Sequence, residues 1–241
     1  RQDDLWSPRL GLAFKPAEPV SLYASYSVSY LPSSGDQFSS LTATHNEAEL
    51  ALKRFRVAPG LKVDLFASEP LLTNPVSFAF DEKGRVFVVE THRRHSSIYE
   101  IDRHLEWLDA DLSFRTVEDR ANFFRKVLVP ENKSLPEKII RDLNGDGKFD
   151  YHDLEVESER LRLLEDRNGD GRADFASTYA EDFKTLVSGV ASGVLVRQTN
   201  VWFACLPDLW LLRDANGDGQ ADSRKPLLHG FGVHIASGAP A

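Results

Sequence analysis

Short runs of alternating apolar and polar residues are the most frequent pattern in this chain, and most of them end at a turn signal. Two runs lie near the N-terminus, Leu10 to Phe14 and Val20 to Tyr30, on either side of the turn KPAEP. In the second run, small and polar residues alternate with aromatic and apolar ones. The pattern predicts a hairpin with one apolar face and one polar face. It suits a strand pair of a membrane β-barrel and equally any half-buried hairpin.

The texture changes after TATHNEAELALKRF, a polar stretch with some helical character. From residue 59 onward, short runs rich in β-branched and aromatic residues follow one another, which is typical of strands. The tetrapeptide DEKG at 81–84 predicts a turn between two of them. The expected strands are Lys62–Ala67, Val76–Phe80, Arg85–Glu90 and Ser97–Ile101.

Residues 116–128 have helical periodicity instead. Thr116 is a suitable N-cap, because its hydroxyl can accept a hydrogen bond from a free amide of the first turn. The apolar residues of the segment recur at helical spacing and share one face, at Val117, Ala121, Phe124 and Leu128. We expect this helix to be an excursion from a sheet scaffold.

An internal repeat organises the second half of the chain. The phrase LLEDRNGDGRAD at 163–174 returns as LLRDANGDGQAD at 211–222, 48 residues later, with the apolar runs SGVASGVLV and NVWFACLP between. A period of this length with about four short strands is typical of a β-propeller blade. We predict an all-β fold, an incomplete β-propeller of about three to four blades over residues 59–241, with 45–58 as a linker. Each copy of the phrase would occupy the same corner of successive blades.

Charge is concentrated in the repeated phrase and in one related loop. The formal net charge of −8 argues against nucleic acid or an anionic membrane surface as a partner. Nine of the 37 acidic residues lie in the three loops DLNGDGKFD, DRNGDGRAD and DANGDGQAD. The remaining surface is therefore close to neutral, and the acidity is a local feature of these loops.

The three loops place oxygen-bearing side chains at positions 1, 3, 5 and 9 around a glycine at position 6. Alternate hard oxygen donors on a glycine turn suit Ca²⁺. Position 12, where a helix-loop-helix calcium site has a bidentate carboxylate, holds Asp153, Ser177 and Lys225 in the three loops, so the second and third are not complete EF-hands. The alternative is that these residues only make turns, with Asx side chains that cap backbone amides. The candidate ligands are Asp142, Asn144, Asp146, Asp150, Asp153, Asp166, Asn168, Asp170, Asp174, Asp214, Asn216, Asp218 and Asp222.

Two places carry candidate catalytic residues. ETHRRH follows the expected strand 85–90 and supplies Glu90, His92, Arg93 and Arg94, at a strand end where propellers place functional groups; strand ends are also often polar for solubility alone. His234 in GFGVHIASG follows a glycine pair, and its alternative role is that of a hydrogen-bonded core histidine. The sequence contains no Ser-His-Asp arrangement, phosphate-cradling glycine loop or zinc spacing, so spacing alone supplies no mechanism.

The remaining features restrict the setting only weakly. Cys205 is the single cysteine and is expected to be a small core residue. No stretch approaches the ~20 apolar residues of a membrane-spanning helix, and no secretion signal opens the chain. The chain begins at Arg1 and contains no methionine, so we expect it to be a fragment of a longer product.

Residues 1–44 resemble a known family in wording as well as in pattern. SPRLGLAFKPAEPVSLYASYSVSYLPSSGDQF is similar to a strand-turn-strand segment of the barrel in TonB-dependent siderophore receptors of the bacterial outer membrane. The resemblance implies one barrel hairpin, which is too short to close a barrel. One hypothesis takes the whole chain as a fragment of such a receptor.

Residues from about 55 to 235 resemble the N-terminal propeller region of membrane-bound dehydrogenases found in planctomycetes and verrucomicrobia. The phrases that carry the resemblance are APGLKVDLFASEPLLTNPVSFAFDEKGRVFVVETHR, ADLSFRTVED, LLEDRNGDGRADFASTYAEDF, SGVASGVLVRQTNVWFACLPDLWLLRDANGDGQAD and GFGVHIA. These proteins are similar to sorbosone and aldose dehydrogenases, propellers that use pyrroloquinoline quinone and calcium. The haem-binding tail common in the family is absent, and the loop at 142–153 resembles an insertion.

This second resemblance implies a quinone-dependent sugar dehydrogenase of the periplasm or cell envelope, with a sugar substrate and an electron-acceptor protein as partners. His234, His92, Arg93 and Glu90 would then lie near the reaction, and Arg94 near the cofactor. Any membrane association would come from parts outside this fragment, which we expect to be inactive alone. The alternative from another class is a non-catalytic, calcium-stabilised propeller module that binds carbohydrate or protein.

Overall fold

The computed structural model describes residues 9–17, 20–27, 47–94, 96–132 and 141–235. Near the N-terminus, β1 (Arg9–Ala17) and β2 (Val20–Ser27) form an antiparallel pair in which Phe14 lies opposite Leu22. The predicted hairpin is therefore confirmed, although the end of its second run, residues 28–30, lies outside the described residues. A short helix, α1 (Glu47–Leu52), follows in the segment expected to have helical character.

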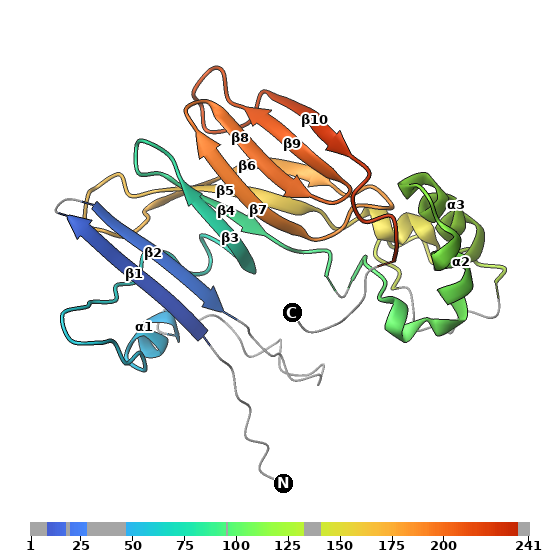
Figure 1. Cartoon of the computed structure of the whole chain (residues 1–241), viewed down its shortest axis with the longest axis horizontal. Helices are drawn as coiled ribbons and strands as arrows, with labels where there is room; N and C mark the ends of the chain where they lie inside the picture. The colour runs from blue at the N-terminus through green and yellow to red at the C-terminus, as the bar shows by residue number, and fades with distance from the viewer. Residues whose placement is uncertain (1–8, 18–19, 28–46, 95, 133–140, 236–241) are drawn as a thin grey trace, which may run out of the picture.

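Two four-stranded antiparallel sheets form the body of the structure (Figure 1). The first sheet has the order β3-β4-β5-β6, and the second has the order β10-β9-β8-β7. Both are meanders of neighbouring antiparallel strands. The strands of the first sheet are β3 (Pro75–Phe80), β4 (Val86–Glu90), β5 (Glu159–Glu165) and β6 (Phe175–Phe183). Those of the second are β7 (Ala191–Arg197), β8 (Asn200–Cys205), β9 (Asp208–Arg213) and β10 (Ser223–His229).

The all-β prediction is confirmed at the level of these two open sheets, which have few helices beside them. The predicted strands at 76–80 and 85–90 match β3 and β4 closely. DEKG forms the expected turn between them, because the Asp81 carboxylate accepts the backbone amides of Lys83 and Arg85 at 2.9 Å each. The two sheets do not close into a ring, and a count of three to four blades stays a prediction.

The main hydrophobic core lies between the sheets. The first sheet contributes Phe87, Val89, Leu161 and Leu163, among others, and the second contributes residues of β7, β8 and β9. In β4, β5 and β8 these are alternate residues, since successive side chains point to opposite faces. The second sheet's share is Ala191, Val196, Val201, Phe203, Cys205 and Leu212. Cys205 is buried here as the expected small core residue.

The repeated phrase occupies the same corner in both sheets. Residues 166–174 connect β5 to β6, the third and fourth strands of the first sheet, and residues 214–222 connect β9 to β10 in the second. The prediction about its placement is confirmed. The offset of 48 residues also holds for the flanking strands, so Leu163 of β5 and Leu211 of β9 occupy equivalent positions.

A helical excursion, residues 101–155, separates β4 from β5 and lies at one end of the sheets (Figure 1). It contains α2 (Leu108–Ser113), α3 (Val117–Val127) and three 3₁₀ turns, at Ile101–Arg103, Leu105–Trp107 and Tyr151–Glu155. Thr116 caps α3 in a capping box with Asp119. The expected apolar face is confirmed, since Val117, Ala121, Phe124 and Leu128 are all buried.

Two predicted strands are wrong. Residues 62–67 are irregular and belong to a covering segment, residues 61–73, in which Phe66, Leu71 and Leu72 pack on the face of the first sheet that points away from the second sheet. Their alternation reflects this one-sided burial and not ladder pairing. Residues 97–101 lead into the helical excursion, where Tyr99 packs edge-on against Trp107. None of the helices in the described part of the chain is long and apolar enough to span a membrane.

The repeat provides a matched pair of substitutions. Leu163 is 0 % exposed between the sheets, whereas its equivalent, Leu211, is only half-buried. We expect Leu163→Ala to lower the free energy of unfolding by about 2–5 kcal/mol, because it leaves a cavity in a packed interface. Leu211→Ala should lower it by about 1 kcal/mol. Urea unfolding followed by circular dichroism measures both, and equal losses would contradict the assigned burial.

Candidate functional site

A buried carboxylate organises the end of β4, where catalytic residues were predicted. Glu159, the first residue of β5, is fully buried. Its Oε1 accepts the Thr91 hydroxyl at 3.0 Å and the backbone amides of His92 and Arg93 at 3.1 and 2.9 Å, and its Oε2 accepts the amide of Ala191 at 2.9 Å. One side chain thus connects both sheets, because Ala191 begins β7. Sequence reasoning missed Glu159, which carries no local motif.

Arg93 is 0 % exposed, and its guanidinium donates to five backbone carbonyls of the described residues. Burial lowers the pKa of Arg93 from its ordinary value, and the nearby charge of Glu159 opposes this shift. A guanidinium surrounded in this way is a structural tie. It joins the end of the helical excursion to the segment before β7. The acceptors are Leu154 at 2.8 Å, Glu157 at 2.6 Å, Ser188 and Thr185 at 3.1 Å each, and Ser97 at 3.5 Å.

The other predicted residues of this cluster have different surroundings. Glu90 is buried; it accepts the amide of Thr73 at 2.8 Å and lies 3.3 Å from the Nε2 of His92 and 3.9 Å from the Nε of Arg162. Arg94, the predicted cofactor contact, is exposed. The structure therefore brings the side chains of Glu90 and His92 together, whereas the Arg93 guanidinium lies among carbonyls of other segments. Both Glu90 and Arg93 hold chain segments in place.

His234 lies at the edge of the helical excursion, in a pair with Asp111 of α2. Its Nδ1 is 3.0 Å from the backbone carbonyl oxygen of Asp111 and 3.5 Å from the Asp111 carboxylate. Because a carbonyl oxygen only accepts, Nδ1 carries the hydrogen in this pair. The Asp111 carboxylate is buried and accepts the amide of Ile235 at 2.6 Å, whereas the His234 side chain is 56 % exposed.

Arg120 of α3 holds the backbone of His234 in place. Its guanidinium donates to the carbonyl of His234 at 3.1 Å and to that of Val187 at 2.7 Å. Burial lowers the pKa of Arg120 to about 10, although the charge of Asp111 opposes the shift. Val187 precedes Ser188, which Arg93 holds, so one short segment connects the His234 pair with the Glu159 cluster. Asp111 and Arg120 lie in ADLSFRTVED and its continuation, but nothing in their local sequence marked them as partners of His234.

The acidic loops are built on hydrogen bonds from their own backbone. In the second loop, Asp166 accepts the amides of Gly169 at 2.7 Å, Asp170 at 3.2 Å and Gly171 at 2.8 Å. Both glycines have positive φ, 77° and 89°, which directs their amides to the carboxylate. Asp142 and Asp214 accept the equivalent glycine amides in the other two loops, and Asn144, Asn168 and Asn216 each accept the amide two residues on.

The last acids of the loops also accept backbone amides. Asp174 accepts the amide of Arg167, and Asp222 accepts that of Ala215. In the first loop, the carboxylate of the buried Asp153 accepts the backbone amide of Leu143 at 2.9 Å and those of Asn144 and Asp150. Asp150 accepts the backbone amide of His152. The aspartates at position 5 each accept the backbone amide two residues further on; they are Asp146, Asp170 and Asp218. This is the Asx-turn arrangement of the alternative interpretation.

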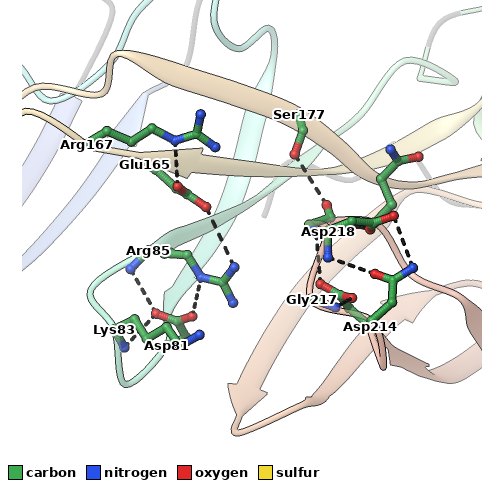
Figure 2. Close-up of polar contacts among 12 residues, drawn as sticks. Asp81, Lys83, Arg85, Glu165, Arg167, Ser177, Asp214, Gly217 and Asp218 are labelled. Carbon is green, nitrogen blue, oxygen red and sulfur yellow. Dashed lines mark hydrogen bonds and ion pairs between the residues drawn. The ribbon is translucent and has the colours of Figure 1, made fainter.

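Basic side chains form ion pairs with carboxylates next to the loops (Figure 2). Arg85 forms an ion pair with Asp81 at 2.7 Å and lies 3.7 Å from Glu165, which also pairs with Arg167. Burial alone would lower the pKa of Arg85, but the hydrogen bond to Asp81 and the charges of Asp81, Glu165 and Asp214 raise it. Within the described ranges, no group of three or more His, Cys, Asp or Glu side chains converges to hold a metal ion. Calcium at these loops therefore stays a prediction.

Comparison with known families gives two matches. The family described as Domain of unknown function (DUF7133) matches residues 47–237, so the chain belongs to this family. The family described as TonB dependent receptor-like, beta-barrel matches residues 1–68, which include the β1–β2 hairpin. This second match agrees with the resemblance noted for residues 1–44. No curated protein and no solved structure matches the chain.

The buried Arg93 and its exposed neighbour Arg94 provide a matched pair of substitutions. Arg93→Met should lower the free energy of unfolding by about 3–5 kcal/mol, because it leaves buried carbonyls and the Glu159 carboxylate without their cation. Arg94→Met removes the same charge from an exposed position and should change stability by less than about 0.5 kcal/mol. Thermal and urea unfolding of both variants test the assignment, and a stable Arg93→Met variant would refute it.

Proposed function

We propose that this chain supplies part of a sugar dehydrogenase-like β-propeller in which His234 acts as the general base. The observation that carries the proposal is the Asp111–His234 pair. The ring donates through Nδ1 to a backbone carbonyl, it is oriented by a buried carboxylate, and it is more than half exposed. Among the predicted catalytic residues, His234 combines a fixed ring with access for a substrate.

The proposed chemistry follows from this tautomer. With the hydrogen on Nδ1, the neutral ring has its lone pair on Nε2, which can accept the proton of a sugar hydroxyl. The Asp111 carboxylate, 3.5 Å from Nδ1, would stabilise the imidazolium that forms. Hydride would leave the carbon that bears this hydroxyl, so the reaction needs a hydride acceptor. A bound quinone supplies that chemistry in the families that the chain resembles.

Two shallow hollows on the described surface are lined by residues other than His234, Glu90 and Arg94. We therefore assign no residue to the cofactor, and Arg94 stays a prediction. Glu90 and Arg93 are positioning residues in this proposal, because their polar atoms hold chain segments in place. His92, beside Glu90, is their neighbour in the same cluster.

Dye reduction with aldoses tests the base. With pyrroloquinoline quinone and Ca²⁺ added, a complete propeller that contains this chain should reduce an artificial electron acceptor when an aldose is present. His234→Gln should lower the rate at least about 100-fold, the usual contribution of a general base. His229→Gln is the matched control: His229 is also half exposed and also lies beside carboxylates, Asp208 and Glu118, and its loss should leave the rate within about twofold.

The outcomes separate this proposal from a non-catalytic alternative. Equal rates for His234→Gln and the unmodified chain would remove His234 as the base. No turnover by a folded, complete propeller that contains the unmodified chain would favour the binding module, a propeller-type scaffold that recognises carbohydrate or protein. The observation that favours this alternative is the structural use of Glu90, Arg93 and Glu159, which leaves few reactive groups at the end of β4.

We further propose that the three acidic loops bind Ca²⁺ as a structural ion, in either functional alternative. Carboxylate and amide oxygens at alternate positions are suitable donors for Ca²⁺. The loop carboxylates are already bonded to backbone amides, so binding would use their remaining lone pairs and water. Calcium would then stabilise the corner between the third and fourth strands of each sheet and take no part in the reaction.

Calorimetric titration with Ca²⁺ tests this role. We expect binding with a rise in melting temperature relative to chelator, because a ligand that binds only the folded state stabilises it. Asp166→Asn and Asp214→Asn should each remove one binding event, whereas Asp102→Asn, an exposed acid outside the loops, should remove none. No heat of binding and an unchanged melting temperature would reduce the loops to turn chemistry.

The setting is proposed as the bacterial cell envelope or periplasm. The match of residues 1–68 to the receptor barrel family supports an envelope location. A sugar substrate and an electron-acceptor protein would be the partners of the catalytic alternative. The hypothesis of an outer-membrane receptor fragment rests on residues 1–68 alone, and the larger match at 47–237 lies mostly outside them.

A further inference from the structure

The two sheets can be compared position by position. The offset of 48 residues relates Leu161 and Leu163 of β5 to Leu209 and Leu211 of β9. In the first sheet, Val89 lies opposite Leu161 and Phe87 opposite Leu163. In the second, Ala204 lies opposite Leu209 and Trp202 opposite Leu211. The face made by Phe87, Val89, Leu161 and Leu163 therefore has its equivalent in Trp202, Ala204, Leu209 and Leu211.

These equivalent faces differ in what covers them. In the first sheet, the four residues are 0–1 % exposed, because the second sheet packs on them. In the second sheet, the equivalent side chains are only partly buried, and Leu195 of the neighbouring β7 is 62 % exposed. This open face holds a shallow apolar hollow of about 380 Å³, lined by Gly193, Val194, Leu195, Trp202, Ala204 and Leu209.

The opposite face of each sheet can be matched by the same repeat offset. The second sheet contacts the first through Val201, Phe203 and Leu212. The register makes Val86, Val88 and Leu164 their equivalents in the first sheet, and the covering segment 61–73 packs on these three residues. The sheets are therefore stacked in one direction, front face on back face. One end of the stack is covered, and at the other end the described residues leave an apolar face partly exposed.

A repeated backbone hydrogen bond supports the same order. In the third acidic loop, the amide of Ala221 donates to the carbonyl of Tyr179 on β6 at 2.8 Å. In the second loop, the equivalent amide of Ala173 donates to the carbonyl of Phe66 in the covering segment, also at 2.8 Å. Phe66 thus occupies the place that Tyr179 has for the next sheet. The next equivalent acceptor is Leu227, which lies at a register shift of β10 as Tyr179 does in β6.

We propose that the open face of the second sheet binds a further four-stranded sheet of the same repeat. The partner sheet would place side chains equivalent to Val201, Phe203 and Leu212 against Leu195, Trp202, Leu209 and Leu211. The acidic loop of the partner sheet would donate a backbone amide to the carbonyl of Leu227. A second copy of the chain fits this site less well, because the covering segment already occupies the corresponding back face of its first sheet.

A chain extended by one repeat tests the proposal directly. A copy of residues 187–235 is joined after residue 235, which keeps the repeat spacing close to 48, and Leu195→Cys in a Cys205→Ala background places one thiol on the open face. The copy carries the Cys205→Ala change as well. Labelling of this thiol in the native state should be at least tenfold slower in the extended chain than in the unextended one. Leu105→Cys, in the exposed part of the helical excursion, is the matched control and should label at the same rate in both.

The contrary outcomes are distinct. Equal labelling of Leu195→Cys in both chains, with the circular dichroism of a folded extension, would overturn the proposal. Trp202→Glu in the original sheet should restore fast labelling in the extended chain, since it places a charge in the interface; protection that survives this change would also overturn it. A dimer of the unextended chain in sedimentation velocity that Trp202→Glu abolishes would replace the partner sheet by a second copy of the chain. None of these outcomes depends on His234.

Discussion

The junction of the two sheets depends on the buried carboxylate of Glu159. It receives hydrogen bonds from Thr91, His92 and Arg93 after β4 and from Ala191 at the start of β7. A carboxylate that is removed from water in this way is tolerated only when donors satisfy its oxygens, and here three backbone amides and a hydroxyl do so. The contact is made where the helical excursion returns to the sheet, so it fixes the excursion, the first sheet and the second sheet relative to one another.

Arg93 extends this junction. Its guanidinium donates hydrogen bonds to carbonyls at the end of the excursion and in residues 185–188. Arg120 donates to the neighbouring carbonyl of Val187 and to that of His234. The position of His234 therefore follows from two buried arginines that bind backbone and not substrate. The polar residues after β4 and the proposed base near the C-terminal end therefore have different roles. The former bind backbone groups and hold chain segments in place, whereas His234 is exposed.

Local sequence predicted the parts of the fold that local physics determines. The helix at 117–127 was found because its cap and its apolar spacing lie within one segment, and β3 and β4 were found because DEKG separates two alternating runs. The covering segment was misassigned as a strand because one-sided burial produces the same alternation as ladder pairing. Apart from Ser97, which follows Arg93 closely, the partners of Glu159, Arg93 and His234 lie between about 30 and 120 residues away, so no short window of sequence could have paired them.

The acidic loops show how concentrated negative charge can be held without destabilising the corners of the sheets. Each first aspartate lies over the positive ends of backbone amides that the glycines at positions 4 and 6 direct toward it, and Arg85, Arg167 and Lys148 lie beside neighbouring carboxylates. The loops are therefore closed by their own turns before any cation binds. A bound Ca²⁺ would add stability to an arrangement that the backbone already forms. Both repeated loops also make the same outside contact, since the amide of Ala173 or Ala221 donates to the segment or strand that precedes the sheet.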